Sequence, residues 1–420
     1  MRSGLAALTT RGRAFVGGGL ATIVAAAIIG QDSIVRLGVL AVALALLAAW
    51  WVGRSRQRLA LTRVVSPQQV PVGQTARVEL ALSNDAHRST GTLLLEERLP
   101  YVLGTRPRFI LEGMGAGWRR HVSYQVRSDV RGRYEIGPMT VRVVDPFGLV
   151  ELGRTFHQST PLTVTPRVLP LPSTGLGGAW TGSGDNRPRS FASGSAEDVT
   201  VREYRRGDDL RRVHWRSSAR VGELMVRREE QPWQSRATVF LDNRLSAHRG
   251  QGAASSLETA VTAAASVAVH LTQRGYSVRL MTSSGEDHDT EWHARTTAAS
   301  TAPLLEALAV VGADHRPAPD TRWLSDSGGG GLVVAVFGHL STGDAGFLRR
   351  LRHHSGSCMA RALDVDQWAP HAPRLADVDS ATQLTRAGWH SVALGPRDSL
   401  AVAWQQLGAM TSRSVEGARA

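Results

Sequence analysis

The sequence predicts a multidomain α+β protein with an N-terminal transmembrane helical hairpin, an immunoglobulin-like β-sandwich and a C-terminal, Rossmann-like α/β domain. Three observations predict this: two apolar runs near the N-terminus, a segment with a period of two, and a second half in which strands alternate with helices. The length of 420 residues fits roughly two to three domains. The expected boundaries are 1–58 for the hairpin, 59–166 for the β-sandwich, 167–197 for a flexible linker, 198–235 for an Arg/Asp-rich segment, 236–410 for the α/β domain and 411–420 for a disordered tail.

The chain contains no lysine, so all 49 of its basic residues are arginines, against 36 acids and a net charge of +13. This absence excludes Walker-type nucleotide sites, protein kinases and pyridoxal-phosphate enzymes, because each needs a lysine. Arginine in place of lysine, with abundant Ala, Gly and Val, is typical of a genome-wide codon bias. The charge therefore does not by itself indicate a basic partner-binding surface. The single cysteine, Cys358, excludes an intrachain disulfide framework and a Cys-rich zinc module.

Two apolar runs, Ala14–Gly30 and Ile34–Val52, are each long enough to cross a bilayer. As helices (about 14–30 and 34–52) they would span roughly 25 and 28 Å, close to the hydrocarbon thickness. The first run alone resembles a signal peptide, but the second returns to the membrane after only Gln31–Ser33, which disfavours that interpretation. Gly17–Gly19 favours close packing between the two helices.

Arginines flank the outer ends of both runs: Arg2, Arg11 and Arg13 before the first, and Arg54, Arg56 and Arg58 after the second. The positive-inside rule then predicts a two-helix protein of the cell membrane with both termini in the cytoplasm. Trp50 and Trp51 fall where an interfacial aromatic belt is expected.

From Leu61 to Thr165 apolar and polar residues alternate, as in Val78, Leu80 and Leu82. About seven short strands in roughly a hundred residues favour an immunoglobulin-like sandwich. The stretch Asp145–Gly148 is expected to form a turn whose phenylalanine is anchored in the core. Residues 166–197 are rich in Pro, Gly and Ser, which predicts a mobile connection.

Residues 198–228 contain nine arginines beside five acids. Asp208 and Asp209 are expected to cap a short helix, and Tyr204 and Trp215 to bury their rings while keeping a polar atom paired. Three interpretations remain open: a charge-rich structural brace between domains, a docking surface for a protein or an anionic ligand, and a nucleic-acid site. The acids nearly cancel the local charge, so no nucleic-acid partner is expected.

This segment resembles the signature of the domain-of-unknown-function 58 family. The resemblance rests on Arg202, Tyr204, Gly207, Asp208, Arg211, Val213, Trp215, Ser218, Ala219 and Arg220. The candidate interaction surface consists of Arg202, Tyr204, Gly207, Asp208, Arg211, His214, Trp215, Ser218 and Arg220. The stretch Asp145–Leu149 also looks like a feature of that family, and the order of the elements matches over nearly the whole chain. The resemblance implies a bacterial membrane protein with a von Willebrand factor type A-like domain. It further implies a MoxR-type AAA+ ATPase partner, a membrane-bound transglutaminase-like partner, and a role in assembly or in the cell envelope.

The C-terminal region begins with an apolar strand that ends at Asp242. Expected strands follow at 277–282, 332–337, 359–365 and 390–394, with helices at 255–274, 303–311, 345–352 and 400–410. This alternation predicts a mostly parallel sheet with helices on both faces. Ligands of such sheets bind beyond the carboxyl ends of the strands, which is where Asp242 lies.

In von Willebrand factor type A domains an Asp-x-Ser-x-Ser loop binds a metal at this position. Here the loop has Asp242 and Ser246 as possible oxygen ligands, but Arg244 replaces the middle hydroxyl. A guanidinium would repel Mg²⁺, so Asp242 is expected to be a structural carboxylate that either pairs with Arg244 or caps a loop. The later loop has Gly338 and His339 where the resemblance implies an acid and a glycine. We therefore expect no cofactor, with a divalent metal such as Mg²⁺ as the alternative.

Three functional classes follow from these residues. The first is a membrane-anchored, non-enzymatic scaffold without catalytic residues, acting on a cytoplasmic partner. The second is a hydrolase that uses His214 with Asp208 and Asp209. The third is a metal-dependent ligand binder through Asp242 and Ser246. A further set of soft metal donors, His353, His354 and Cys358, lacks a fourth ligand and more simply marks a helix end.

Overall fold

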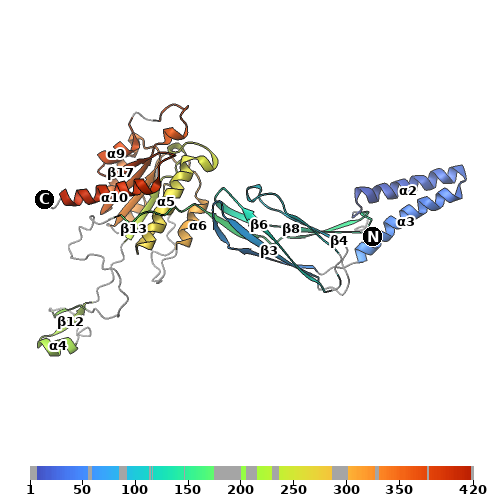
Figure 1. Ribbon diagram of the computed structural model, residues 1–420, viewed down its shortest axis with the longest axis horizontal. Coiled ribbons are helices and arrows are strands. Elements are labelled where there is room, and N and C mark those ends of the chain that lie inside the picture. Colours follow the sequence, from blue (N-terminus) through green and yellow to red (C-terminus); the bar gives the residue numbers. More distant parts are fainter. Residues whose placement is uncertain are drawn as a thin grey trace. The chain divides into compact units, whose positions relative to one another are not determined.

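The computed structural model is a mixed α+β protein (Figure 1). It describes residues 7–54, 59–84, 92–112, 115, 117–145, 147–174, 200–204, 215–228, 236–285, 301–326, 331–375 and 378–417. The chain divides into two compact units. The first unit is Met1–Val168 with Gln251–Ala253 and Leu305–Gly312, and the second is Leu169–Gly250, Ala254–Leu304 and Ala313–Ala420.

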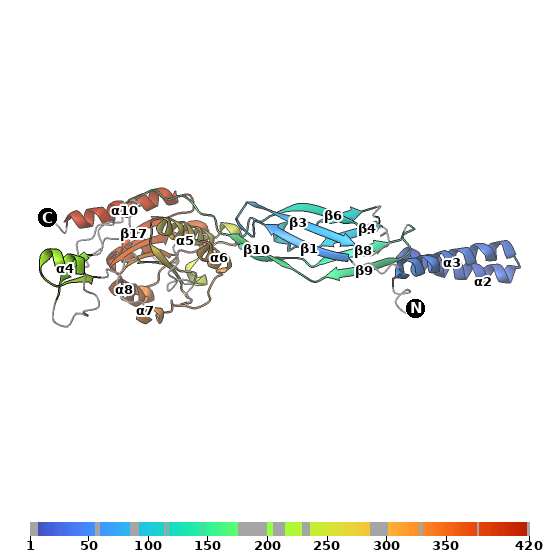
Figure 2. The ribbon, with the colours of Figure 1, turned by 90° about the horizontal axis from the view of Figure 1, so that it is seen from below.

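The first unit begins with two antiparallel helices, α2 (Thr10–Ile29) and α3 (Asp32–Arg54) (Figure 2). Both are long and apolar enough to cross a membrane. A Cβ on Gly19 would lie 2.9 Å from the Gly38 carbonyl oxygen, and one on Gly38 would lie 2.8 Å from that of Gly19. Gly19 therefore allows the close approach of the helices that the sequence predicts. Gly17 and Gly18, which were predicted to share this role, face open space.

Ten strands follow in this part of the described chain. They are β1 (Leu59–Ser66), β2 (Gln69–Pro71), β3 (Thr75–Asn84), β4 (Thr92–Glu97), β5 (Arg108–Leu111), β6 (Arg119–Arg127), β7 (Gly132–Ile136), β8 (Met139–Val144), β9 (Glu151–Phe156) and β10 (Thr160–Thr165), with the 3-10 turn η1 (Tyr101–Leu103) after β4. They pair as sheets β1-β3-β6, β2-β10-β7 and β5-β4-β8-β9. Strand β3 buries every second residue, including Val78, Leu80 and Leu82, as its alternation predicts.

The core of these sheets contains one charged cluster around Glu97, whose side chain is fully buried. The Arg63 guanidinium donates from Nε to the Glu97 Oε1 atom at 2.6 Å, and the Tyr124 hydroxyl donates to Oε2. Burial and the Glu97 charge raise the pKa of Tyr124, so the phenol stays a neutral donor. Both oxygens of the buried Glu97 carboxylate thus have a donor.

The turn after β8 corrects one prediction. Phe147 was expected to anchor the turn in the core, yet its side chain is 61% exposed. The buried residues of the turn are Asp145, Leu149 and Val150 instead. Asp145 accepts hydrogen bonds from the backbone amides of Phe147 and Val150, at 3.0 and 2.6 Å. These bonds close the turn and leave the ring outside it.

The segment Leu305–Gly312, which contains most of helix α6 (Ala302–Val310), packs in the first unit although it lies far along the chain. The buried Arg131 side chain donates to the carbonyl oxygens of Leu308, at 3.1 Å, and Val311. These are carbonyls at a helix C-terminus, which lack partners within the helix and favour a cation. This segment was expected to belong wholly to the α/β domain.

The second unit is built on a parallel five-stranded sheet of order β14-β13-β15-β16-β17. The strands are β13 (Arg236–Leu241), β14 (Ser277–Thr282), β15 (Leu332–Phe337), β16 (Ser357–Leu363) and β17 (His390–Leu394). The helices are α5 (Ser256–Gln273), α7 (Trp323–Asp326), α8 (Ala345–His353), α9 (Ser380–Arg386) and α10 (Leu400–Gly417). Figure 2 shows α5 and α10 on one face of the sheet and α7 and α8 on the other.

Three expectations for this region need correction. Helix α9 was not predicted, although two adjacent parallel strands such as β16 and β17 need a crossover between them. The tail from Thr411 was expected to be disordered, but α10 continues to Gly417 and the buried Thr411 hydroxyl donates to the Leu407 carbonyl at 3.0 Å. The start of the expected flexible linker is held in place, because the Leu169 amide donates to the Ser266 hydroxyl on α5 at 2.9 Å.

The buried Glu97 cluster gives a first test. Replacing Glu97 by Ala leaves the Arg63 guanidinium buried without its carboxylate, so we expect the free energy of unfolding of the first unit to fall by about 3–5 kcal/mol. Urea unfolding, monitored by hydrogen exchange of the β3 and β6 amides, measures this free energy. The matched control is Glu79→Ala on the exposed face of β3, where a change within about 0.5 kcal/mol is expected. Equal losses in the two variants would contradict this account.

Candidate functional site

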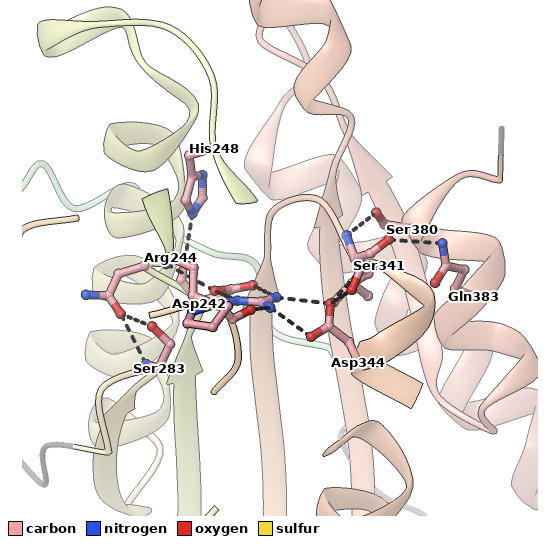
Figure 3. A network of polar contacts seen from close by, with 11 residues as sticks. Asp242, Arg244, His248, Ser283, Ser341, Asp344, Ser380 and Gln383 are labelled. Carbon is pink, nitrogen blue, oxygen red and sulfur yellow. Dashed lines mark hydrogen bonds and ion pairs between the residues drawn. The ribbon is translucent and has the colours of Figure 1, made fainter. Parts of the chain in front are cut away.

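The candidate site lies at the carboxyl end of β13, which is flanked in the sheet by β14 and β15. The strand is apolar and buried up to Leu241, and the chain then turns through Asp242, Asn243 and Arg244, all of them buried. Figure 3 shows the side chains of Asp242 and Arg244 together with those of Ser283, Ser341 and Asp344. This is the position at which parallel α/β sheets bind ligands.

Arg244 pairs with Asp242, as the sequence predicts. Its Nε atom donates to Oδ1 of Asp242 at 2.9 Å and its Nη2 atom to Oδ2 at 2.8 Å, which is a bidentate contact. A second carboxylate, Asp344, accepts from Nη1 at 2.7 Å and from Nη2 at 3.3 Å. The Pro317 carbonyl takes a further bond from Nη1 at 3.1 Å. The guanidinium is therefore enclosed between two acids and a carbonyl.

Asp344 is held in place by the loop after β15. It ends the 3-10 turn η5 (Thr342–Asp344), and its Oδ2 atom accepts from the Ser341 amide at 2.8 Å and the Ser341 hydroxyl at 3.0 Å. The preceding residue, Leu340, is fixed from α9: its amide donates to the Ser380 hydroxyl at 3.0 Å and its carbonyl accepts from Gln383 at 3.1 Å (Figure 3). The Asp344 carboxylate is thus oriented by hydrogen bonds from its own loop.

The loop after β15 supplies an acid to the site at Asp344. The resemblance implied an acid and a glycine where Gly338 and His339 lie, whereas the acid that contacts Arg244 from this loop is Asp344. Gly338 has a different role, since a Cβ there would lie 2.0 Å from the Ala247 carbonyl oxygen. The His339 amide donates to that same oxygen at 2.8 Å. Glycine at 338 therefore allows the β15 loop to contact the turn after Arg244.

The charges at the site favour a permanent cation from the protein itself. Burial lowers the pKa of Arg244, but its hydrogen bonds and charge contacts with Asp242 and Asp344 outweigh burial and raise the pKa above its ordinary value. Both oxygens of Asp242 already accept from Arg244. Ser246 lies exposed on the turn η3 (Leu245–Ala247). The residues present do not fit a divalent ion at Asp242, because the guanidinium takes the oxygens that the ion would need.

His248 connects this turn to helix α5. Its Nε2 atom lies 2.6 Å from the Asp242 carbonyl and its Nδ1 atom 3.0 Å from the Ser256 hydroxyl. The carbonyl can only accept, so Nε2 carries the hydrogen and Nδ1 accepts from Ser256, which itself accepts from the Arg249 amide at 2.9 Å. Burial lowers the pKa of His248, which agrees with this neutral form.

The Arg/Asp-rich segment is described only in part. Strands β11 (Thr200–Glu203) and β12 (Met225–Arg228) pair antiparallel, and helix α4 (Trp215–Val221) lies between them in sequence. The Tyr204 amide donates to the Leu224 carbonyl at 2.8 Å, and the Ser218 hydroxyl accepts from the Met225 amide at 2.8 Å. Arg202 lies in β11 and Arg220 is exposed in the last turn of α4. Gly207, Asp208, Arg211 and His214 lie outside the described residues.

Trp215 corrects the prediction that its ring would be buried. Its side chain is 71% exposed at the start of α4. Val221 and Leu224, which follow in the same small unit, are also exposed large apolar residues. The described part of the signature therefore has three large apolar side chains at its surface.

Other candidate ligands are separated by the fold. His353 ends α8 and His354 caps it, as the sequence predicts for a helix end, while Cys358 is buried in β16. Burial raises the pKa of the Cys358 thiol to about 11, which keeps it protonated. Among the residues that the structure describes, no group of three or more His, Cys, Asp or Glu side chains is arranged to hold a metal ion.

Sequence reasoning missed Arg361, which is fully buried in β16. Its Nη1 atom donates to the Leu400 carbonyl at 3.1 Å, and its guanidinium carbon lies 5.5 Å from the centre of the Trp404 ring. Burial lowers its pKa to about 10. The sequence signal was an arginine in an otherwise apolar parallel strand, where a charged residue is unexpected.

Arg244 gives a direct test of metal binding. Arg244→Ser restores the Asp-x-Ser-x-Ser pattern and leaves Asp242 and Asp344 unpaired, so we expect a loss of about 3–5 kcal/mol that Mg²⁺ or Mn²⁺ partly restores. Arg244→Met is the control, since it removes the charge without adding an oxygen and should not respond to metal. Thermal unfolding with and without about 5 mM Mg²⁺, a concentration ample for a site of this kind, measures the stability of both variants. An equal Mg²⁺-dependent shift in the unchanged protein would contradict the assignment.

His248 gives a pH test. Because its pKa is lower in the folded than in the unfolded protein, its contribution to stability is present above about pH 6.5 and is lost as the pH falls below that value. We expect the free energy of unfolding to fall by up to about 1.4 kcal/mol per pH unit from this group. His248→Gln keeps a donor to the Asp242 carbonyl. In urea titrations this variant should show a smaller difference in the free energy of unfolding between pH 7 and pH 5. Unchanged pH dependence in the variant would remove His248 as its source.

Comparison with solved structures finds likenesses that each cover about a quarter of this chain. A CARDB domain from Pyrococcus furiosus in complex with di-metal ions has 15% identity and a TM-score of 0.21, over 26% of this chain and 96% of that one. A complex of Zinc 2-glycoprotein and prolactin inducible protein from human seminal plasma has 11% identity and a TM-score of 0.20, over 26% and 97%. A beta-glucosidase from Listeria innocua has 12% identity and a TM-score of 0.16, over 26% and 16%.

Among curated proteins, none matches this chain. A family model described as "Protein of unknown function DUF58" matches residues 200–324. The matched range begins with β11, includes Trp215, Ser218 and Arg220 of the signature, and continues through Asp242 and Arg244. Residues 200–324 of this chain are therefore similar to the DUF58 family of proteins of unknown function.

Proposed function

We propose that this protein is a membrane-anchored, non-enzymatic scaffold that presents its α/β unit and its Arg/Asp-rich segment to a protein partner. The anchor is the helical pair α2 and α3, whose outer surfaces expose Leu20, Val24 and Leu40. Such side chains are accommodated by lipid rather than by water. With arginines at the outer ends of both helices, the positive-inside rule gives cytoplasmic termini and a cytoplasmic α/β unit.

The observation that carries the proposal is Arg244 between Asp242 and Asp344. The strand-end position at which an α/β sheet would bind a metal or a small ligand is filled by a side chain of the protein. The loops around it are held by hydrogen bonds from Ser341, Ser380 and their neighbours. A face fixed in this way requires no ligand to take its shape, which suits a constant binding surface.

The exposed side chain of Trp215 supports a docking role for the signature. Tryptophan, tyrosine and arginine are the residues most often found to contribute strongly to protein–protein binding. Trp215 is exposed within a segment of nine arginines and five acids, so the proposed surface combines an apolar anchor with charged residues among which arginine is in excess. An acidic and partly apolar protein surface would match it.

The partner that we propose is a MoxR-type AAA+ ATPase, with a membrane-bound transglutaminase-like protein as a further component. Support for this choice comes from the family resemblance of the signature and from the proposed cytoplasmic position of the α/β unit. Assembly or cell-envelope processes would then be the setting in which the scaffold acts. The hydrolase alternative depends on His214, which lies outside the described residues, and the metal-dependent alternative does not fit the contacts of Asp242.

The test is direct binding between the detergent-solubilised full chain and a purified MoxR-type ATPase from the same genome. We expect a saturable complex that Trp215→Ala weakens about tenfold or more, as for a tryptophan at the centre of an interface. Biolayer interferometry measures the affinity. Tyr101→Ala is the matched control, because it removes an exposed aromatic side chain from the first unit and should leave the affinity unchanged.

Binding that persists in a chain lacking residues 198–420 would overturn the assignment of the partner surface. Absence of binding with every MoxR-type ATPase of the genome would overturn the choice of partner.

A further inference from the structure

The turn Asp145–Val150, here called the β8–β9 turn, is fastened to the start of α2. The Thr9 amide donates to the Leu149 carbonyl at 3.0 Å, and the Thr9 hydroxyl donates to the Gly148 carbonyl at 2.7 Å. Leu8 and Val150 form an antiparallel bridge, and the Glu151 amide donates to the Ala7 carbonyl at 2.8 Å. The residues before α2 thus pair with this turn as a short strand would.

Thr9 is also the N-cap of α2. Its hydroxyl oxygen accepts from the Gly12 amide at 3.1 Å, so one side chain both starts the helix and holds the turn. Gly12 is required for this contact, because a Cβ there would lie 2.1 Å from the Leu149 carbonyl oxygen. No side chain can be added at this position without moving the turn away from the helix.

The same turn contacts α3 through apolar side chains. Leu149 and Val150 are buried in a cluster whose other buried members are Leu8, Ala45, Ala48 and Val52. Ala48 and Val52 lie in the last two turns of α3. The β8–β9 turn is therefore packed at the end of the hairpin where α2 begins and α3 ends. The β-strands are therefore joined to the hairpin by contacts with both helices, in addition to the chain itself.

Phe147 projects from this fastened turn with its side chain 61% exposed. Asp145 and the Gly148 backbone, which has a φ of +69°, fix the turn beneath it. Trp50 and Trp51, in the last turns of α3, are 60% and 52% exposed. Three large aromatic side chains are thus exposed at the end of the hairpin where a bilayer surface would lie if the helices span it. Arg11 and Arg13 are exposed at the same end.

We propose that the β8–β9 turn is a membrane-contact element that places Phe147 in the interfacial layer of the bilayer, together with Trp50 and Trp51. This inference rests on the proposed function, since it requires α2 and α3 to span the membrane. Aromatic side chains at the headgroup level and arginines outside them are the pattern expected of a bilayer boundary. The bonds of Thr9 hold the loop at that depth, so the β-strands begin at the membrane surface.

Site-directed spin labelling of the full chain tests the inference. In a Cys358→Ala background, which removes the single cysteine, Phe147→Cys, Trp51→Cys, Leu40→Cys and Tyr101→Cys are each labelled with a nitroxide and reconstituted into phosphatidylethanolamine–phosphatidylglycerol vesicles. Power saturation then compares accessibility to oxygen, which enters lipid, with accessibility to a water-soluble nickel chelate. We expect the oxygen-to-nickel ratio at 147 to match that at 51 and to exceed that at 101 several-fold.

Tyr101 is a suitable reference for water. Its side chain is 91% exposed. It comes shortly after Glu97, the last residue of β4, which pairs with Met139 at the start of β8, whereas the β8–β9 turn follows the end of β8. A label at 147 with the ratio found at 101 would overturn the membrane contact. A label at 147 shielded from both reagents would indicate a protein neighbour and would also overturn it. If the label at Leu40, in the middle of α3, is open to the nickel chelate, the hairpin does not span the bilayer and the proposed function fails as well.

A matched glycine pair tests the fastening. Gly12→Ala introduces the clash with the Leu149 carbonyl, whereas Gly17→Ala adds a Cβ on the same helix in open space. We expect Gly12→Ala to lower the oxygen-to-nickel ratio at 147 several-fold while the ratio at Leu40 stays unchanged, and Gly17→Ala to change neither. An unchanged ratio at 147 in Gly12→Ala would show that the contact with α2 does not hold the turn at the membrane.

Discussion

The organisation of the second unit depends on the charge balance around Arg244. Two carboxylates come from loops that follow different strands, and they would repel each other without a cation between them. The guanidinium supplies that cation and adds directional hydrogen bonds to both carboxylates. A hydrated metal ion would instead make its contacts through water and exchangeable ligands. Because arginine stays protonated at all physiological pH values, this connection between β13 and the loop before α8 does not depend on metal supply.

Neighbouring hydrogen bonds hold the loops around Arg244, Asp242 and Asp344 in place. Asn243 accepts from the Ser283 amide and hydroxyl at the end of β14, and Gly338 allows the β15 loop to reach the Ala247 carbonyl. Three adjacent strands therefore end in loops that bond to one another around a single buried cation. The first unit is joined to its helices in a similar way, since Gly12 admits a carbonyl from the β8–β9 turn. In both places a missing side chain permits a main-chain contact.

Several parts of this arrangement could be predicted from the sequence, for reasons that are local. The apolar run of β13 is followed at once by Asp242, and Arg244 is two residues away, so the strand end and the ion pair follow from spacing alone. The alternation of β3 and the helix positions of α5 and α8 are equally local patterns. The family resemblance agrees with the match over residues 200–324, while its von Willebrand factor type A and ATPase associations stay predictions.

The rest depends on contacts between residues far apart in the chain. Asp344 lies 100 positions after Arg244, and an acid in a loop gives no local sign of the cation that it binds. Phe147 and Trp215 were predicted to be buried because large aromatic side chains usually are, yet both are exposed. Their exposure follows from the bonds of their neighbours: Asp145 and Thr9 close the turn under Phe147, and Trp215 begins a helix of only seven residues.

The position of Leu305–Gly312 has a consequence for the synthesis of the chain. The first unit consists mainly of residues 1–168, but Arg131 donates to the carbonyls of Leu308 and Val311, and these two residues are synthesised much later. During translation the ribosome adds about 5–20 residues per second, so the β-rich part waits roughly ten seconds or more before these partners exist. Until then the buried arginine is without two of its acceptors. A fragment ending at 168 would remain permanently in that incomplete state, and the second unit cannot be excised without removing the completing segment.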